Sequence, residues 1–411
     1  MPHYDIIIIG GGAAGFFSAV NAANFFPNKS IAILEKSSKF LSKVKVSGGG
    51  RCNATNATFE VKQLLQNYPR GNKELINTFS QFNSKDTIEW FAKRNVKLVA
   101  EPDGRMFPST NSSQTIIDCL LNECVKHKIG IITNTDVIAV TKNKELFELK
   151  LRNPDSNRDK NYTCKKLVIT SGGNSNTESY NWLREIGHSI TPPIASLFTF
   201  NLKDKTICNL MGLSVTNASI KINESKLNYS GPLLITHWGF SGPAILKLSA
   251  FGAQFLHDKN YQYKVTVNWL GDVSEKELRD ELNQIKEIDK FKKIHGFCPF
   301  NFPKRLWEYF LIESKIDSDL TWANVSNKQL NSLIQQLLFN TFECNGKTTF
   351  KEEFVTCGGI KRTEIDFKTM QSKLVPNLFF AGEVIDVDGI TGGFNFQAAW
   401  STGFVAAKSL F

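Results

Sequence analysis

The sequence has few of the features that would place it outside ordinary globular proteins. It contains no internal repeat and no low-complexity segment, and its hydrophobic and charged fractions of 41% and 21% exclude a disordered or fibrous chain. The most apolar stretch, residues 6–20, is interrupted by four glycines and is too short to span a bilayer. A strand pattern begins by Tyr4, which leaves no room for a basic targeting region. We therefore expect a cytoplasmic protein that does not bind a membrane.

The eight cysteines have neither the spacing of a zinc site nor that of a dense disulfide framework. Only Cys119 and Cys124 stand close enough to resemble a redox pair. They lie in a helical apolar pattern, which favours buried packing over redox chemistry. We expect free thiols in a reducing compartment and no metal site.

Lys and Arg outnumber Asp and Glu, which gives a formal net charge of +10, but no block of five or more Lys and Arg occurs. A basic balance can serve nucleic acid, a membrane surface or an anionic ligand. Because the cations are spread along the chain, a solvated lysine-rich surface is favoured and nucleic acid is disfavoured as a partner. An anionic cofactor accounts for part of the excess.

The length of 411 residues is too great for one ordinary core, so two or three structural units are expected. Alternating strands, helices and glycine turns predict an α/β nucleotide-binding domain over residues 1–192 and 351–411. Alternating apolar and polar residues predict an inserted antiparallel β domain over 193–272 and about 341–350. A helical domain is expected over 273–340.

Hydrophobic periodicity places the individual elements within these domains. The N-terminal β-α-β unit consists of strands at 4–9 and 30–34 around a helix that ends near Asn24. The pattern further predicts a helix at 111–128, strands at 129–151 and 162–170 with a polar turn at 153–160, antiparallel strands throughout 195–270, and a last helix from Phe396 to about Leu410. Capping boxes mark two helix starts, Ser274 with Glu277 and Ser326 with Gln329.

A G-x-G-x-x-G motif, Gly10 to Gly15, follows the first strand and opens the first helix. Gly10 allows a tight turn, Gly12 leaves room for a pyrophosphate, and Gly15 permits close packing of helix and strand. The pyrophosphate is expected at the helix N-terminus. An acid at the end of the second strand is expected to bind the adenosine ribose. The predicted dinucleotide site therefore comprises Gly10, Gly12, Ala13, Ala14, Gly15, Glu35 and Lys36.

A second glycine-rich segment near the C-terminus follows a buried strand that ends in Gly382-Glu383. An acid there can hold a ribityl hydroxyl or position phosphates, and a glycine-rich helix start can direct N–H groups at a flavin pyrimidine. Such a segment, returning after a long insertion, is typical of two-dinucleotide-fold flavoproteins and favours FAD. The predicted flavin-binding residues here are Gly382, Glu383, Asp388, Gly392, Gly393, Asn395 and Phe396.

Several blocks make a family resemblance specific. Ser47-Gly-Gly-Gly-Arg-Cys-Asn-Ala-Thr-Asn56 and Thr236-His-Trp-Gly-Phe-Ser-Gly-Pro243 resemble the SGGGRCNxTN and THxGxSGP blocks of the YhiN-like, BaiN-like or aminoacetone-oxidase-type flavoproteins. Shorter matches are Gly104–Pro108, Phe302–Leu306, Val355–Ile360, Thr369–Lys373 and Gly382–Gly389. The resemblance implies FAD and three units: a Rossmann-like FAD-binding domain, an inserted antiparallel β-barrel-like domain and a small helical domain. The chain departs from the family after Ser171, where most of the usual glycines are missing.

The SGGGRCN block is expected to approach the flavin ring or the pyrophosphate. The further predicted cofactor contacts are Lys43, Ser47, Gly48, Gly49, Gly50, Arg51, Cys52, Asn53, Gly172 and Gly173. His237 is a candidate general acid or charge partner to the substrate. Cys52 is either a redox thiol or a small packed one, and Arg51 supplies cationic charge, so that the catalytic candidates are His237, Cys52 and Arg51. His188 is expected to be structural.

No second G-x-G-x-x-G follows a strand, so a separate NAD(P)H domain is not expected. Electrons come from the substrate, from NAD(P)H as a transient donor, or from a protein donor. The favoured hypothesis is an FAD-dependent oxidoreductase with non-covalent flavin and a small organic substrate, either an amine oxidase or a reductase of an activated C=C bond. An RNA-modifying flavoprotein and a flavin-binding regulatory protein without turnover stay as alternatives. The oligomeric state is open.

Overall fold

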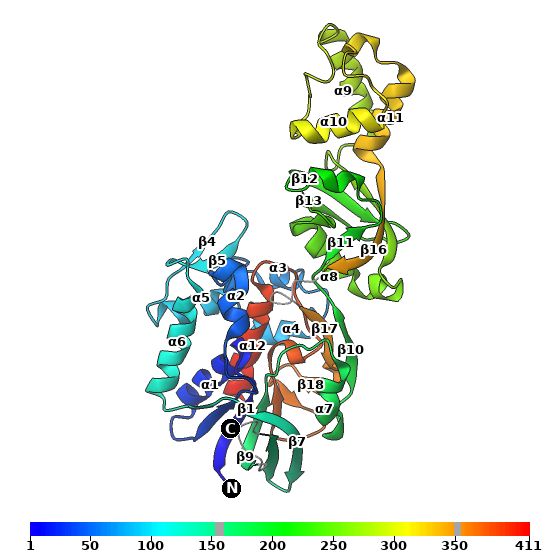
Figure 1. Ribbon diagram of the computed structural model, residues 1–411. Helices are drawn as coiled ribbons and strands as arrows, with labels where there is room; N and C mark the ends of the chain where they lie inside the picture. Colours follow the sequence, from blue (N-terminus) through cyan, green and yellow to red (C-terminus); the bar gives the residue numbers. More distant parts are fainter. Residues whose placement is uncertain (153–159, 349–354) are drawn as a thin grey trace. The chain divides into compact units, whose positions relative to one another are not determined.

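The computed structural model describes residues 1–152, 160–348 and 355–411. The chain divides into two compact units, Met1–Ser196 with Lys351–Phe411, and Leu197–Phe350 (Figure 1). The second unit is thus inserted into the first. The predicted polar turn at 153–160 falls on 153–159, outside the described residues.

The first unit is built on a mixed sheet with a parallel centre, of order β18-β19-β20-β9-β1-β2-β6. The strands from β20 to β6 run parallel, and the middle one of them is β1 (His3–Ile9), which pairs with β2 and β9. Residues 6–9 of β1 are buried, as an apolar strand covered on both faces requires. The other strands are β2 (Ile31–Leu34), β6 (Gly130–Ile132), β9 (Lys160–Ile169), β18 (Ile365–Asp366), β19 (Gln371–Ser372) and β20 (Leu378–Phe380), with β7 (Asp136–Asn143) and β8 (Leu146–Arg152) joined through β9. The predicted Rossmann-type α/β fold is confirmed.

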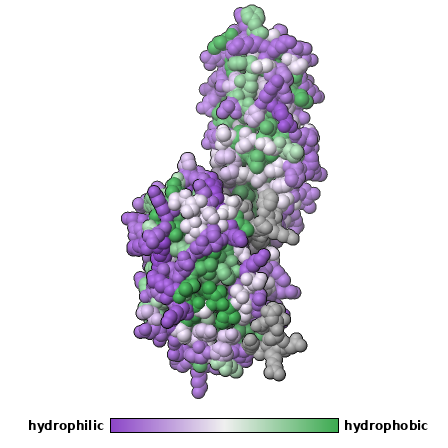
Figure 2. All heavy atoms as spheres, turned by 60° about the vertical axis from the view of Figure 1, so that its left-hand side comes forward, coloured by the Kyte–Doolittle hydropathy of each residue, from purple (hydrophilic) through white to green (hydrophobic). Residues whose placement is uncertain are grey.

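Two helices from opposite ends of the chain, α1 (Ala13–Phe25) and α12 (Phe394–Lys408), pack together (Figure 1). An aromatic cluster joins them, with the Phe17 and Trp400 ring centroids 5.1 Å apart. The other helices of this unit are α2 (Ser42–Gly50), α3 (Val61–Leu65), α4 (Leu75–Phe79), α5 (Ser84–Ala92), α6 (Ser113–Lys126) and α7 (Asn181–Glu185). Two small sheets complete it, formed by β3 (Thr55–Asn56), β4 (Leu98–Ala100) and β5 (Arg105–Pro108), and by β10 (Ile190–Ala195) with β17 (Thr356–Ile360). Figure 2 shows apolar side chains gathered among hydrophilic ones on one face of this unit.

The second unit contains a closed antiparallel barrel of order β11-β14-β13-β12-β15-β16. Its strands are β11 (Thr199–Leu202), β12 (Ser214–Ile222), β13 (Asn228–Ile235), β14 (Gly239–Ser241), β15 (Gln262–Asn268) and β16 (Asn340–Thr348). The barrel confirms the expected inserted β architecture. The expectation of strands throughout 195–270 is wrong, because α8 (Pro243–Asp258) lies within it. Pro243 at the first helical position and buried residues at helical spacing explain this helix.

Helices α9 (Glu275–Ile288), α10 (Lys304–Glu313) and α11 (Asn327–Leu338) form the helical part of the second unit. Both predicted capping boxes are present, Ser274 with Glu277 and Ser326 with Gln329. The barrel and these helices belong to one compact unit, whereas the sequence patterns assign them to separate domains. Across the described part of the chain, no helix has both the length and the apolar character that crossing a bilayer requires.

Candidate nucleotide-binding site

The glycine turn after β1 is held by close backbone packing. Gly10 has a φ of +109°, and a Cβ there would lie 2.4 Å from the Thr170 carbonyl oxygen. A Cβ on Gly15 would lie only 1.9 Å from the Gly10 carbonyl oxygen. Both positions therefore require glycine for reasons internal to the fold, which agrees with a tight turn and with close packing of helix and strand.

Gly12, the N-cap of α1, differs from these two glycines. Its φ of −92° is open to any residue, and a Cβ built there would meet no atom within 4 Å. Neither conformation nor packing explains why this residue has no side chain. The first turn of a helix also presents N–H groups without intrahelical partners. The space beside Gly12 thus fits an anionic group that approaches the backbone closely.

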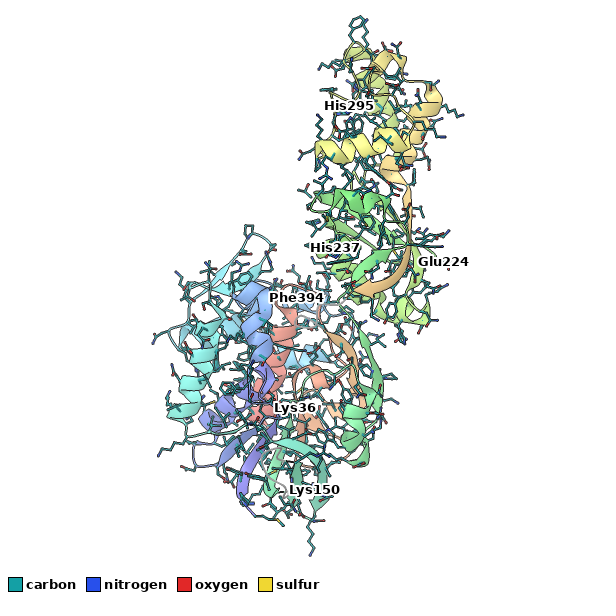
Figure 3. The ribbon with its side chains drawn as sticks, viewed as in Figure 1. Lys36, Lys150, Glu224, His237, His295 and Phe394 are labelled. Atoms are coloured by element: carbon teal, nitrogen blue, oxygen red, sulfur yellow. The ribbon has the colours of Figure 1, made fainter. Side chains whose placement is uncertain are left out.

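The acid at the end of β2 is engaged within the turn itself. Glu35 Oε2 accepts a hydrogen bond from the Gly11 amide at 2.8 Å, while Oε1 accepts from the amide and hydroxyl of Ser37, both at 2.9 Å. Glu35 therefore holds the glycine turn in place through the Gly11 amide. Lys36 next to it is exposed (Figure 3).

The SGGGRCN block begins where helical geometry ends. Helix α2 starts at Ser42, and its dihedral angles become non-helical at Ser47, Gly48 and Gly49, the first three residues of the block. Positive φ angles follow at Gly48, Gly49, Gly50 and Cys52. Cβ atoms on Gly49 and Gly50 would meet nothing within 4 Å. The block thus exposes a stretch of backbone without side chains.

The two reactive candidates in this block are both engaged by their surroundings. Arg51 Nη1 lies 2.7 Å from Glu101 Oε1, and its guanidinium lies 4.0 Å from the centre of the Phe107 ring. Cys52 is fully buried, and burial raises the pKa of its thiol to about 12. The thiol is therefore protonated at neutral pH, which fits a packed residue better than a thiolate nucleophile.

Contacts within the first unit bring the N-terminal and C-terminal predicted residues together. Lys43 Nζ lies 2.7 Å from Glu383 Oε2, and Glu383 Oε1 accepts a hydrogen bond from the Thr356 amide at 3.1 Å. A Cβ on Gly173 would meet the same Glu383 carboxylate at 2.9 Å. Gly172 has a φ of +72° and open space beside it. One acid therefore connects three separate stretches of chain.

The start of α12 packs directly on the segment that follows Cys52. Asn56 Nδ2 donates to the Gly392 carbonyl at 3.0 Å, and a Cβ on Gly393 would lie 2.8 Å from Asn53 Oδ1. Phe396 stacks on Trp400 at 5.7 Å, and the Trp400 indole donates to the Ala54 carbonyl at 2.8 Å. Asn395 closes the preceding loop, because its side chain donates to the Gly389 carbonyl and accepts from the Gly389 amide.

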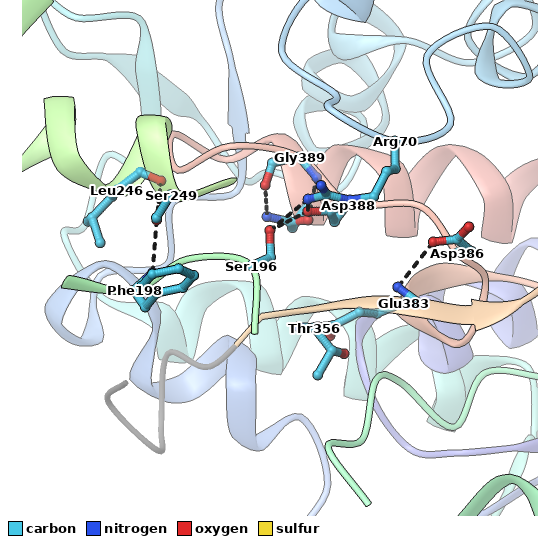
Figure 4. Close-up of polar contacts among 12 residues, drawn as sticks. Arg70, Ser196, Phe198, Leu246, Ser249, Thr356, Glu383, Asp386, Asp388 and Gly389 are labelled. Carbon is cyan, nitrogen blue, oxygen red and sulfur yellow. Dashed lines mark hydrogen bonds and ion pairs between the residues drawn. The ribbon is translucent and has the colours of Figure 1, made fainter. Parts of the chain in front are cut away.

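Asp388 is fully buried in an ion pair with Arg70. Arg70 donates to both carboxylate oxygens and Ser196 Oγ donates to one of them (Figure 4). Burial alone would lower the pKa of Arg70, but the hydrogen bonds and charge of Asp388 outweigh it and raise that pKa. Sequence reasoning missed Arg70 and Ser196, because neither stands in a block with a recognisable motif.

His237 lies in the second unit, on an exposed turn before β14 (Figure 3). The turn is closed by the Thr236 amide, which donates to the Gly239 carbonyl at 2.7 Å, and the imidazole lies edge-on to Trp238 at 4.2 Å. His188 is buried in the first unit, where its Nε2 lies 2.9 Å from Ser372 Oγ.

All eight cysteines are free thiols. Cys119 and Cys124 are buried on α6. Within the described residues, no group of three or more His, Cys, Asp or Glu side chains could hold a metal ion.

Comparison with known proteins shows the family. The chain belongs to the family described as HI0933-like protein Rossmann domain, whose profile matches residues 4–409. It is 31% identical to a ribosomal RNA dihydrouridine synthase of Escherichia coli K12, over 100% of this chain and 98% of that protein. It is 26% identical to a 3-dehydro-bile acid delta(4,6)-reductase of Clostridium scindens, over 98% of both chains. The resemblance to the YhiN-like and BaiN-like flavoproteins is therefore confirmed.

Solved structures of low identity share the fold. A 3-ketosteroid-delta4-(5alpha)-dehydrogenase from Rhodococcus jostii matches with a TM-score of 0.53 at 11% identity, covering 100% of this chain and 97% of its own. Escherichia coli quinol fumarate reductase matches with a TM-score of 0.53 at 14% identity, covering 99% of this chain and 70% of its own. The fold of this chain is the Rossmann-type fold of FAD-binding flavoproteins.

Proposed function

We propose that this protein is an FAD-dependent reductase of a carbon–carbon double bond conjugated to a carbonyl group, and that its substrate is a uridine in ribosomal RNA. The observation that carries the cofactor assignment is the open space beside Gly12, where neither φ nor packing requires glycine. A pyrophosphate that contacts the backbone at the start of α1 accounts for it. FAD, when bound, accepts a hydride from a donor and delivers it to the substrate.

The reaction class is supported by the names of two relatives. Dihydrouridine is uridine whose ring double bond has been reduced, and a delta(4,6)-reductase also reduces C=C bonds. In uracil that double bond is conjugated to a carbonyl, so a hydride adds to its β-carbon and a proton to its α-carbon. The electrons come from a reduced nicotinamide, which must visit the flavin transiently because the sequence has no second dinucleotide motif.

Ribosomal RNA is favoured over a small enone for two reasons. Relatives with the RNA-modifying name reach 31% and 30% identity over nearly the whole chain, against 26% for the bile acid reductase. The net charge of +10 also suits a polyanionic substrate. The spread of the cations and the family resemblance of the sequence blocks favour a small organic substrate, but the identities to the relatives favour ribosomal RNA.

The residues of the chain have distinct roles in this proposal. The start of α1 binds the pyrophosphate, and the glycine-rich start of α12 directs amides at the flavin pyrimidine. Lys43 and Glu383 already form an ion pair, which holds together the two chain segments that carry them. His237, exposed on its turn, is the candidate proton donor to the α-carbon.

The test has two stages. Anaerobic stopped-flow absorbance follows the visible flavin band after mixing with NADH or NADPH, and rapid bleaching by one of them is expected. Protein-free ribosomal RNA is then incubated with enzyme and donor, digested to nucleosides and analysed by mass spectrometry for a gain of two hydrogens on uridine. Protein that is colourless and does not bind added FAD would overturn the cofactor assignment. Bleaching followed by reduction of a steroid enone, but not of RNA, would replace the RNA substrate with a small molecule.

A further inference from the structure

We infer that residues 290–305, the connection between α9 and α10, form an RNA-binding surface. We call these residues the basic aromatic segment. The inference rests on the proposed function, because it names the surface through which the proposed substrate is held. It concerns the helical part of the second unit, which carries none of the predicted cofactor contacts.

Charge is sharply segregated in this part of the chain. Residues 273–340 contain ten Lys and Arg and ten Asp and Glu. The basic aromatic segment contains five of the cations, none of the acids, and four phenylalanines. The rest of the helical part is therefore net acidic, and the segment is its one basic stretch. Interleaved cations and aromatic rings are the composition used to bind single-stranded nucleic acid.

Backbone hydrogen bonds to neighbouring residues hold the start of the basic aromatic segment in place. The Ile294 amide donates to the Leu320 carbonyl at 2.9 Å, and the Trp322 amide donates to the Lys292 carbonyl at 3.0 Å. The Trp307 indole donates to the Ile294 carbonyl at 2.9 Å, and the Ile294 side chain is fully buried. The start of the segment is thus fixed against its neighbours, so the side chains on either side of Ile294 need little ordering when a ligand binds.

The Phe291 side chain is exposed instead of being packed in the interior. It is 83% exposed, although the backbone around it is fixed, and Lys290 Nζ lies 5.1 Å from the ring centre. Ile288, at the end of α9, is 69% exposed. An exposed aromatic ring next to lysines provides a face on which a base can stack while the ammonium groups contact phosphates.

The three lysines at the start of the segment, Lys290, Lys292 and Lys293, are available to an anionic ligand. Lys292 pairs with Asp289 at 2.8 Å and Lys293 with Asp319 at 2.6 Å, but all four partners are at least partly exposed. Exposed ion pairs contribute little and can exchange for phosphate contacts. Among the described residues, no acid pairs with Lys290. His295 adds a partly exposed ring (Figure 3), whose Nε2 lies 3.2 Å from Glu308 Oε1.

The experiment measures binding of fluorescent oligouridylate and of protein-free ribosomal RNA to the FAD-loaded full-length protein, by anisotropy and filter binding over a salt series. The test variant is K290Q/F291A/K292Q. The matched control K276Q/I312A/K328Q removes two exposed lysines and one exposed apolar side chain elsewhere on the helical part. The test variant is expected to bind RNA about tenfold or more weakly, with a log–log salt slope shallower by about 2, and the control to bind like wild type.

Circular dichroism, thermal unfolding and flavin content establish that both variants are folded. A second variant, K290E alone, should weaken binding in the same direction. Equal binding by test variant and control would overturn the inference, as would segment-dependent binding to phosphatidylglycerol vesicles without binding to RNA. If the segment binds RNA but no dihydrouridine forms, the surface stands and the proposed function fails. If dihydrouridine forms and the test variant binds RNA normally, the function stands and the surface fails.

Discussion

Arg70 holds both carboxylate oxygens of Asp388 in the interior of the first unit. Ser196 shares the same carboxylate, and the Ser196 amide donates to the Val355 carbonyl at 2.9 Å. Ser196 is the last residue before the chain enters the second unit. One buried ion pair therefore anchors the point at which the chain leaves the nucleotide-binding unit.

We expect D388N to destabilise the protein by about 3 kcal/mol even without FAD, because removing one partner leaves the other charge buried and uncompensated. Urea unfolding of the apoprotein measures it. E224Q, which removes an exposed pair with Lys259, is the control and should leave the urea midpoint unchanged. A D388N apoprotein as stable as wild type, with only its FAD affinity reduced, would make Asp388 a cofactor ligand rather than an anchor.

We expect G12A to affect mainly FAD binding and G15A to affect mainly the stability of the fold. Because Gly12 has open space beside it, G12A should leave apoprotein stability unchanged and raise the Kd for FAD roughly tenfold or more. G15A places a Cβ 1.9 Å from the Gly10 carbonyl oxygen and should destabilise the apoprotein by about 1–3 kcal/mol. Flavin fluorescence titration and thermal unfolding give the two quantities. Unchanged FAD affinity in G12A would contradict the assigned pyrophosphate position.

Lys43 and Glu383 should act as one unit toward the cofactor. E383Q and K43Q are each expected to weaken FAD binding several-fold, and the double variant should be hardly worse than either single one, because the same pair is lost in all three. The coupling is obtained from a double-mutant cycle on FAD affinity. Fully additive losses would show that the two side chains contact the cofactor separately.

Stability should fall at alkaline pH. Burial raises the pKa of Cys52 and of Cys164 from 9.0 to about 12. A thiol whose pKa is raised in the folded state binds its proton more tightly there, so its contribution is complete below the unfolded value of 9.0 and is lost as pH rises toward about 12. The urea midpoint should therefore decline between about pH 9 and 11.

The same shift predicts how Cys52 reacts. Iodoacetamide at neutral pH should leave Cys52 unmodified in the native protein and modify it in urea, as peptide mass spectrometry would show. C52A should retain flavin reduction. Rapid native modification would mean that the thiol is exposed and ionised.

Much of the architecture could be read from short-range patterns. The apolar run of β1, the glycine turn at Gly10 and the capping box at Ser274 each depend on neighbouring residues, and all appear where expected. Helix α8 was missed, although Pro243 marks its start, because short alternating runs around it suggested strands. The helical turn that begins at Ser42 and precedes the SGGGRCN block was not predicted either.

The contacts that assemble the candidate site could not be predicted. Arg70 and Asp388 are 318 residues apart, and Lys43 and Glu383 are 340 apart. Such pairs depend on how the chain returns to the sheet after the insertion, which no local pattern encodes. Arg70 also looks ordinary in the sequence, since a lone arginine is usually solvated.

The pairing of β10 with β17 has a consequence for how this family can diversify. Ala195 lies opposite Thr356, so the two ends of the inserted unit meet as adjacent antiparallel strands. Such an insertion is topologically equivalent to an enlarged hairpin loop. Evolution can therefore exchange or lengthen the inserted module without disturbing the sheet that supports the glycine turn.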